Sequence, residues 1–281
     1  MKVKAILPAC GKGLVSIVLM LTGCTTTSPS DRFEAAARAH DLTSGEVVGR
    51  DFHHRTFARA ERGSGDLFVY FGGDGTPFVR RDVIAADPTP RDPLTLGLLA
   101  RGPAPAVFLG RPCYHGLMAG CHPELWTVGR YSETVVASLT AATRRLIEDV
   151  SGNVVLIGYS GGGVLALLVA ERVERVDAVV TLAANLDIDH WVDLHDYSPL
   201  VTSINPVTIA GRRPDLIHLH FVGDADLVVP PSIHTRLTER LPPRAFRTLA
   251  GFDHRCCWVQ QWPQLAAELD ERLTEHARGR R

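Results

Sequence analysis

Residues 153–173 read NVVLIGYSGGGVLALLVAERV, a stretch in which two apolar segments meet at one serine and four glycines. The run 154–157 contains β-branched residues and ends at a glycine, which is typical of a buried strand. Residues 162–173 are apolar almost all round, which predicts a buried helix. Ser160 therefore lies where a strand ends and a helix begins. It either fills a turn that the glycines permit or is a nucleophile that they hold in place.

The rest of the chain repeats this pattern of strand followed by helix. Further short apolar runs lie at 67–71, 106–110, 178–183, 217–223 and 246–251. Runs that are apolar on both faces are typical of a parallel sheet covered by helices. Helical patterns occupy 31–40, 132–152, 162–173 and 264–278, and a pair of strands is indicated within 46–60. The alternation predicts an α/β fold, a doubly wound and mostly parallel sheet with helices on both faces.

The length of 281 residues fits one large α/β domain, which we expect over residues 46–281. The longer excursion at 185–215 is interpreted as a small cap. Lys and Arg together number 30 and Asp and Glu 31, so no strong field indicates a nucleic-acid partner. The sequence says nothing about the oligomeric state.

Polar residues follow the predicted strands at the points where each strand ends. They are the GGDG sequence at 72–75, Ser160, Asp187, Asp226 and His254. Because ligands of open α/β sheets bind at the carboxyl ends of the strands, we expect these residues to converge on one site.

A serine hydroxyl becomes a useful nucleophile only when a neighbouring base takes its proton. His254 is the expected base and Asp226 the carboxylate that orients it, in the chain order Ser160, Asp226, His254. Asp224 and Asp187 are the alternatives for the acid. His190 and His195 are interpreted as cap or structural residues.

With these residues in place, the chain resembles the α/β-hydrolase superfamily over roughly residues 46–275. GYSGG at 158–162 matches the nucleophile elbow of that superfamily, and GDADLVVP at 223–230 matches its acid turn. The segments RDPLTLGLLA, RPC and DHRCCW suggest a bacterial subgroup of lipoprotein-like hydrolases. The resemblance implies that Ser160 is the nucleophile, Asp226 the acid and His254 the base.

The same resemblance implies an oxyanion hole made of backbone N–H groups. One donor is expected from Gly161, the residue after the nucleophile, and the other from Gly73 or Asp74. FGGDG at 71–75 lies where the superfamily has a His-Gly-Gly-Gly loop, and it lacks the histidine. A carboxylate aimed at a developing oxyanion would oppose it, so the Asp74 side chain is expected to point away.

These residues predict a serine hydrolase that cleaves a carboxylic ester or thioester through an acyl-serine intermediate. The alternatives are an acyltransferase with the same triad and a non-catalytic envelope lipoprotein that binds a ligand. The mechanism requires no metal or organic cofactor. A phosphate-binding loop is disfavoured because GYSGGG lacks the Gly-Lys-Ser/Thr ending of such loops.

The N-terminus resembles a bacterial lipoprotein signal. It has three lysines and an apolar core of eight residues, LVSIVLML at 14–21, followed by LTGC. Eight residues are too few to span a bilayer. We expect a signal peptide at 1–23, cleavage before a lipidated Cys24, and a tether and helix at 24–45. The protein would then be anchored to a membrane of the cell envelope, and Thr25 after the cysteine favours the outer membrane. An ordinary signal peptide is the alternative.

Six cysteines are present, of which Cys10 would leave with the signal and Cys24 would carry the lipid. The other four, Cys113, Cys121, Cys256 and Cys257, allow three disulfide connectivities. A bond between Cys113 and Cys121 is favoured because these two residues are close in sequence.

Overall fold

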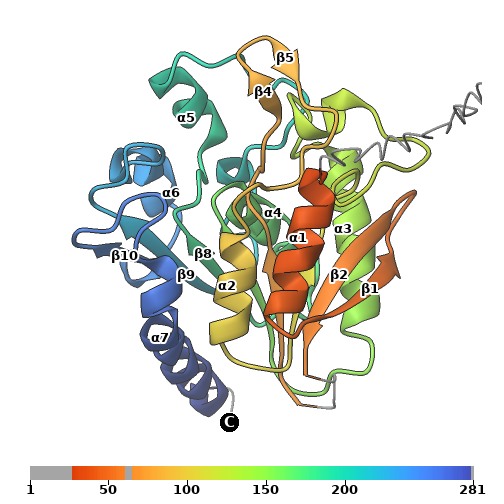
Figure 1. Ribbon diagram of the computed structural model, residues 1–281. Helices are drawn as coiled ribbons and strands as arrows, with labels where there is room; N and C mark the ends of the chain where they lie inside the picture. Colours follow the sequence, from red (N-terminus) through yellow and green to blue (C-terminus); the bar gives the residue numbers. More distant parts are fainter. Residues whose placement is uncertain (1–26, 61–64, 280–281) are drawn as a thin grey trace, which may run out of the picture.

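An eight-stranded sheet forms the centre of the computed structural model, which describes residues 27–60 and 65–279. The strand order is β1-β2-β6-β3-β7-β8-β9-β10 (Figure 1). Neighbouring strands are parallel from β6 through to β10, while β2 is antiparallel to both β1 and β6. The predicted fold class, a mostly parallel doubly wound sheet, is therefore confirmed. The strands are β1 (Thr43–Val48), β2 (His53–Arg59), β3 (Leu67–Phe71), β6 (Ala106–Leu109), β7 (Val154–Tyr159), β8 (Ala178–Leu182), β9 (Ile217–Gly223) and β10 (Phe246–Leu249).

Helices cover both faces of this sheet, as Figure 1 shows. One face carries α1 (Pro29–Ala39), α2 (Leu94–Arg101) and α7 (Trp258–Gly279), and the other carries α3 (Glu133–Leu146) and α4 (Gly161–Ala170). Strand β3 shows why two cores form. Its residues alternate between them, with Val69 packed on the side of α3 and α4 and Tyr70 on the side of α2 and α7.

Two predicted helices have different bounds in the structure. The pattern at 132–152 predicts a longer helix than α3, which ends at Leu146, although Ile147 and Val150 continue into the core as turns. The pattern at 264–278 begins too late, because Trp258 and Trp262 are fully buried one turn apart and extend α7 toward its start.

Three further segments stand at the carboxyl edge of the sheet, outside the helices named above. A hairpin of β4 (Phe78–Arg80) and β5 (Val83–Ile84) follows β3, and the sequence pattern does not predict it. The excursion at 185–215 contains α5 (Ile188–Leu194) and a short 3-10 turn, Pro206–Thr208, and the short helix α6 (Thr235–Thr238) follows β9. In the part of the chain that the structure describes, no helix is both long and apolar enough to cross a membrane.

The described residues contain two disulfide bonds, Cys113–Cys121 and the bond between the adjacent residues Cys256 and Cys257. The sequence leaves the second pair unassigned. Both bonds lie in loops at the carboxyl edge, one after β6 and one directly before α7. The predicted signal peptide, Cys10 and the predicted lipidation site Cys24 lie outside the described residues.

Candidate active site

Ser160 occupies the sharp turn between β7 and α4. Its backbone has φ 52° and ψ −130°, a conformation that residues other than glycine rarely adopt. Such strain costs about 1–3 kcal/mol and persists only where neighbours hold it. Here the Ser160 N–H donates to the Leu182 carbonyl at 2.9 Å, and the Gly163 N–H donates to the Ser160 carbonyl at 2.8 Å. The turn is therefore fixed from both sides.

The glycines around Ser160 allow backbones to approach closely. A Cβ at Gly158 would overlap the backbone of Gly162 and Gly163, and a Cβ at Gly162 would overlap the carbonyl of Phe71 in β3. A Cβ at Gly163 would overlap the side chain of Ala184. Gly163, to which the sequence assigns no separate task, thus lets the start of α4 pack against the end of β8.

His254 lies between Ser160 and Asp226. The Nδ1 atom of His254 is 2.9 Å from Oδ2 of Asp226, and its Nε2 atom is 3.1 Å from Oγ of Ser160. Asp226 is buried, at 1% exposure, and its other oxygen accepts the N–H groups of Val228 and Val229 at 2.8 Å each. An ionised carboxylate can only accept, so Nδ1 carries the proton and Nε2 is free to accept the serine hydroxyl. This arrangement is the one that a serine nucleophile requires.

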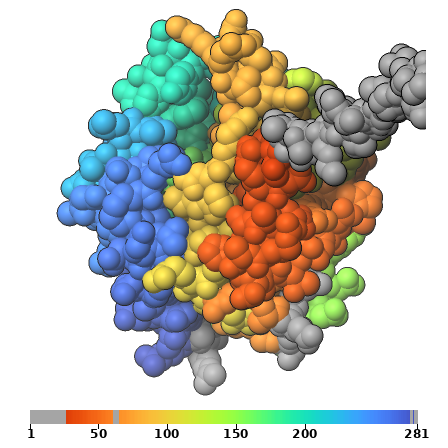
Figure 2. Space-filling model, viewed as in Figure 1, coloured from red at the N-terminus to blue at the C-terminus, as the bar shows by residue number. Residues whose placement is uncertain are grey.

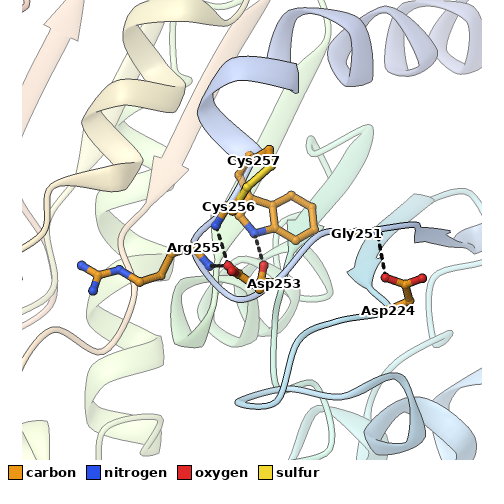
Figure 3. The surroundings of a disulfide bond; sticks show 7 residues. Asp224, Gly251, Asp253, Arg255, Cys256 and Cys257 are labelled. Atoms are coloured by element: carbon orange, nitrogen blue, oxygen red, sulfur yellow. Dashed lines mark hydrogen bonds between the residues drawn. A yellow bond between two sulfur atoms is a disulfide. The ribbon is translucent and has the colours of Figure 1, made fainter.

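The loops after β9 and β10 are joined, which brings Asp226 to His254. The Asp224 N–H donates to the Leu249 carbonyl at 3.1 Å, and the Asp224 carboxylate accepts the Gly251 N–H at 2.7 Å (Figure 3). A Cβ at Gly223 would overlap the Phe252 carbonyl. Asp224, one alternative for the acid, is thus occupied in holding the two loops together.

Asp187, the other alternative, is fully buried in a different set of contacts. Its carboxylate binds the guanidinium of Arg236 and accepts the amide of Asn205 at 3.0 Å. His195 is close to the Val228 carbonyl, at 2.8 Å, and forms an aromatic group with Trp191 and Tyr197. No hydrogen bond between described residues joins His190, His195 or Asp187 to Ser160.

A cavity of about 420 Å³ opens beside Ser160 and His254, and the glycine loop after β3 forms one of its walls. Gly72, Gly73, Asp74 and Gly75 all line it. Among the described residues, no acceptor binds the backbone N–H groups of Gly73, Asp74 or Gly161. The loop and the first turn of α4 therefore place free N–H donors around the serine, as an oxyanion hole requires.

The Asp74 side chain is the centre of a buried ionic cluster. Its carboxylate accepts Arg111 at 2.8 Å and Arg130 at 3.0 Å, and the Tyr131 hydroxyl lies within 2.8 Å of both oxygens. The Tyr114 hydroxyl donates to the Asp74 carbonyl at 2.9 Å. These partners fix the side chain and the backbone of the loop together.

Burial raises the pKa of the Asp74 carboxyl, but the two guanidiniums and the Tyr131 hydroxyl outweigh this effect and lower it below the ordinary value. The carboxylate also lies close to Gly161, where a Cβ would overlap it. The sequence predicts only that this side chain points away from a developing oxyanion. The structure shows that Arg111 and Arg130, which the sequence does not single out, neutralise the charge of this carboxylate.

Other aromatic residues of the site have structural contacts. The Tyr159 hydroxyl donates to the His254 carbonyl at 2.6 Å, and Trp126 donates to the Ala85 carbonyl at 3.1 Å. His115 packs against Phe33 and Phe108 rather than lining the cavity. Within residues 27–60 and 65–279, no group of three His, Cys, Asp or Glu side chains is arranged to hold a metal ion.

No protein-family profile matches the chain, and no curated protein sequence matches it either. Solved structures do match. An esterase from Pyrococcus furiosus is 14% identical with a TM-score of 0.54, over 84% of this chain and 90% of that one. A protein of unknown function from Agrobacterium tumefaciens, described as a candidate α/β hydrolase, is 15% identical with a TM-score of 0.51, over 84% of this chain and 97% of that one.

A puromycin-hydrolyzing peptidase from Mycobacterium tuberculosis is similar over 84% of this chain but only 39% of its own, with 15% identity and a TM-score of 0.56. At these identities the likeness concerns the course of the backbone, and it agrees with the strand order and the turn at Ser160. The chain therefore has the α/β-hydrolase fold.

Proposed function

We propose that the protein is a serine hydrolase that cleaves carboxylic esters or thioesters through an acyl-serine intermediate. The observation that supports this most directly is the hydrogen-bonded chain from Asp226 through His254 to Ser160 at the wall of a cavity. The hydrolases among the similar folds are consistent with this proposal.

In the first half of the reaction, Ser160 Oγ attacks the acyl carbonyl while His254 Nε2 takes its proton. The N–H group of Gly161 and one from Gly73 or Asp74 bind the developing oxyanion, and each such donor is worth about 3 kcal/mol of transition-state stabilisation. The alcohol or thiol then leaves with the proton from His254.

In the second half, His254 takes a proton from water, whose oxygen attacks the acyl-serine. Collapse of the tetrahedral intermediate formed by this attack releases the carboxylic acid, and His254 returns the proton to Ser160. Asp226 stays ionised throughout and stabilises the imidazolium that forms twice in each turnover. Besides the substrate and water, neither half requires a group from outside the chain.

Labelling with a fluorophosphonate tests the proposal, because this probe phosphonylates activated serines. We expect the wild-type chain to be labelled and to hydrolyse p-nitrophenyl esters or acyl thioesters, and we expect Ser160→Ala to do neither while unfolding at the same urea concentration. A folded wild-type chain that is not labelled would instead indicate a ligand-binding protein.

We also propose that the protein is anchored to a membrane of the cell envelope through a lipid on Cys24. The lipoprotein-like N-terminal sequence supports this placement. Incorporation of labelled palmitate should occur in the wild-type chain and be lost in Cys24→Ser. Incorporation that survives the substitution would contradict the anchor.

A further inference from the structure

The exposed large hydrophobic side chains in the described part of the chain lie at one edge of the sheet. Among the described residues, eleven large hydrophobic side chains are exposed. Each of them lies at or beyond the carboxyl end of a strand of the main sheet, the edge that also carries Ser160. Single exposed apolar residues are ordinary, but a group restricted to one edge marks an interaction surface.

Nine of these side chains lie in three segments that follow β3, β8 and β9, and we call them the apolar rim. Four belong to the β4–β5 hairpin, three to the segment 194–201 and two to the turn after Asp226. Leu227, directly beside the proposed acid, is 85% exposed. The nine residues of the rim are Phe78, Val79, Val83, Ile84, Leu194, Tyr197, Val201, Leu227 and Val228.

The hairpin is the most prominent part of the rim. All five residues of its two strands are exposed, and Figures 1 and 2 show it projecting at the top of the molecule. Arg80 and Arg81 stand at its turn, both exposed. Neither side chain forms a hydrogen bond or an ion pair with another described residue. The hairpin therefore presents apolar side chains and two unpaired cations together.

A second cavity, lined in part by residues of the rim, adjoins the first. This cavity of about 800 Å³ lies between the hairpin and α5 and is lined by Phe78, Trp191 and Tyr197. It shares Gly75 and Thr76 with the cavity beside Ser160. A molecule held at the rim would thus be close to the candidate nucleophile.

The chain enters the fold at this same edge. Ser30, in the first turn of α1, donates its N–H and its hydroxyl to the Asp87 carboxylate at 2.9 and 2.8 Å. Asp87 lies three residues after the end of the hairpin at Ile84. Cys24 precedes Thr27, the first described residue, by three positions, which span at most about 10 Å of extended chain. A lipid on Cys24 would therefore hold the bilayer on the side of the rim.

We propose that the apolar rim docks on a lipid bilayer, with the hairpin side chains among the headgroups and Arg80 and Arg81 paired with anionic phosphates. A surface that combines apolar side chains with unpaired cations has the chemistry of an interfacial lipid-binding element. The substrate class that follows, acyl esters held in the bilayer, rests on the function proposed above, whereas the docking itself does not. Docking would place the cavity at Ser160 against the membrane.

Flotation with lipid vesicles tests the docking without the anchor. The parent protein for this experiment begins at position 24 and carries Cys24→Ser. These changes leave every contact of the described residues in place. We expect it to bind vesicles of phosphatidylcholine with phosphatidylglycerol more tightly than vesicles of phosphatidylcholine alone. The triple variant V79T/V83T/I84T keeps β-branched residues and should bind at least about tenfold more weakly. R80Q/R81Q should bind the anionic vesicles about tenfold or more weakly and lose the preference for them.

The control is V48T, which changes an equally exposed valine at the same edge but outside the apolar rim, on the outermost strand β1, and should bind as the parent does. Urea unfolding shows whether each variant is folded. A parent that does not bind either kind of vesicle, or a folded triple variant that binds like the parent, would overturn the proposal. So would a parent that is dimeric by light scattering and a triple variant that is monomeric, because the rim would then be an interface between two copies.

Hydrolysis of a soluble p-nitrophenyl ester by the same samples separates this proposal from the proposed function. Hydrolysis without vesicle binding would contradict the docking alone. Vesicle binding without hydrolysis would contradict the proposed function alone. The triple variant should hydrolyse the soluble ester at the parent rate, because none of its three positions lines either cavity.

Discussion

The loop after β3 and the loop after β10 both reach Ser160, but they are held in different ways. Asp74 in the first loop is bound by two guanidiniums and a tyrosine, and the Arg111 side chain is only 4% exposed. In the second loop, the Asp253 carboxylate accepts the N–H groups of Arg255 and Cys256 at 2.7 and 2.6 Å at the surface (Figure 3). Buried charges fix one loop, and local backbone contacts fix the other.

The difference follows from what each loop is proposed to do. Backbone donors for an oxyanion are effective only when they are rigid before the reaction, and a buried ionic cluster supplies that rigidity. His254 needs one orientation, which Asp226 and the Tyr159 hydroxyl supply from outside its own loop. Substitutions at the contacts of the first loop should therefore lower the stability of the protein. Substitutions at the contacts that orient His254, above all at Asp226, should instead lower the catalytic activity.

Replacing Asp226 should have the largest effect. Asp226→Asn removes the acceptor that sets the proton on Nδ1 of His254, and we expect kcat for ester hydrolysis to fall by about 10⁴-fold. Asp187→Asn is the matched control, since Asp187 is equally buried and also follows a strand of the sheet but does not contact His254. A large loss in Asp187→Asn with little change in Asp226→Asn would reverse the assignment of the acid.

Breaking the buried cluster should have the next largest effect, measured as stability. Arg111→Met leaves the Asp74 carboxylate buried with one guanidinium fewer, and we expect a loss of about 3 kcal/mol in the free energy of unfolding by urea. Arg255→Met is the control in the other loop, where the ion pair with Asp92 is largely exposed and should be worth less than about 1 kcal/mol. Equal losses in the two variants would remove the distinction between the loops.

Much of the sheet and the three residues of the hydrogen-bonded chain could be predicted from the sequence. The predicted strands 67–71 and 217–223 coincide with β3 and β9 because most of their residues are buried and apolar. Ser160, Asp226 and His254 could be brought together because each follows a strand, and parallel strands share one carboxyl edge.

The partners of Asp74 could not be predicted in the same way. Arg111 and Arg130 lie 37 and 56 residues further along the chain, and nothing in a single arginine distinguishes a buried ion pair from a solvated side chain. The hairpin escaped prediction because both of its strands are exposed, so its residues show no alternation between buried and exposed faces. Such features depend on distant contacts or on the solvent, which local patterns do not record.

A further effect on stability should appear on acidification, in contacts next to the first loop. His54 supports the strand end before Arg111, since its Nδ1 lies 2.8 Å from the Gly110 carbonyl and its Nε2 lies 2.8 Å from the Ser138 hydroxyl. Burial lowers the pKa of His54 from 6.5 to about 4. Between these values the unfolded chain binds a proton that the folded chain does not, so stability falls as the pH drops from about 6.5 to about 4.

For His54 alone this loss is on the order of 3 kcal/mol over that range. Urea unfolding at a series of pH values should show a shallower dependence on pH in His54→Gln, which cannot take up the proton, than in the wild-type chain. Parallel curves would mean that His54 is not held neutral by its surroundings. A shallower curve in the variant would place this part of the acid sensitivity in the buried contacts behind the Asp74 loop, as expected if burial and not the surface fixes that loop.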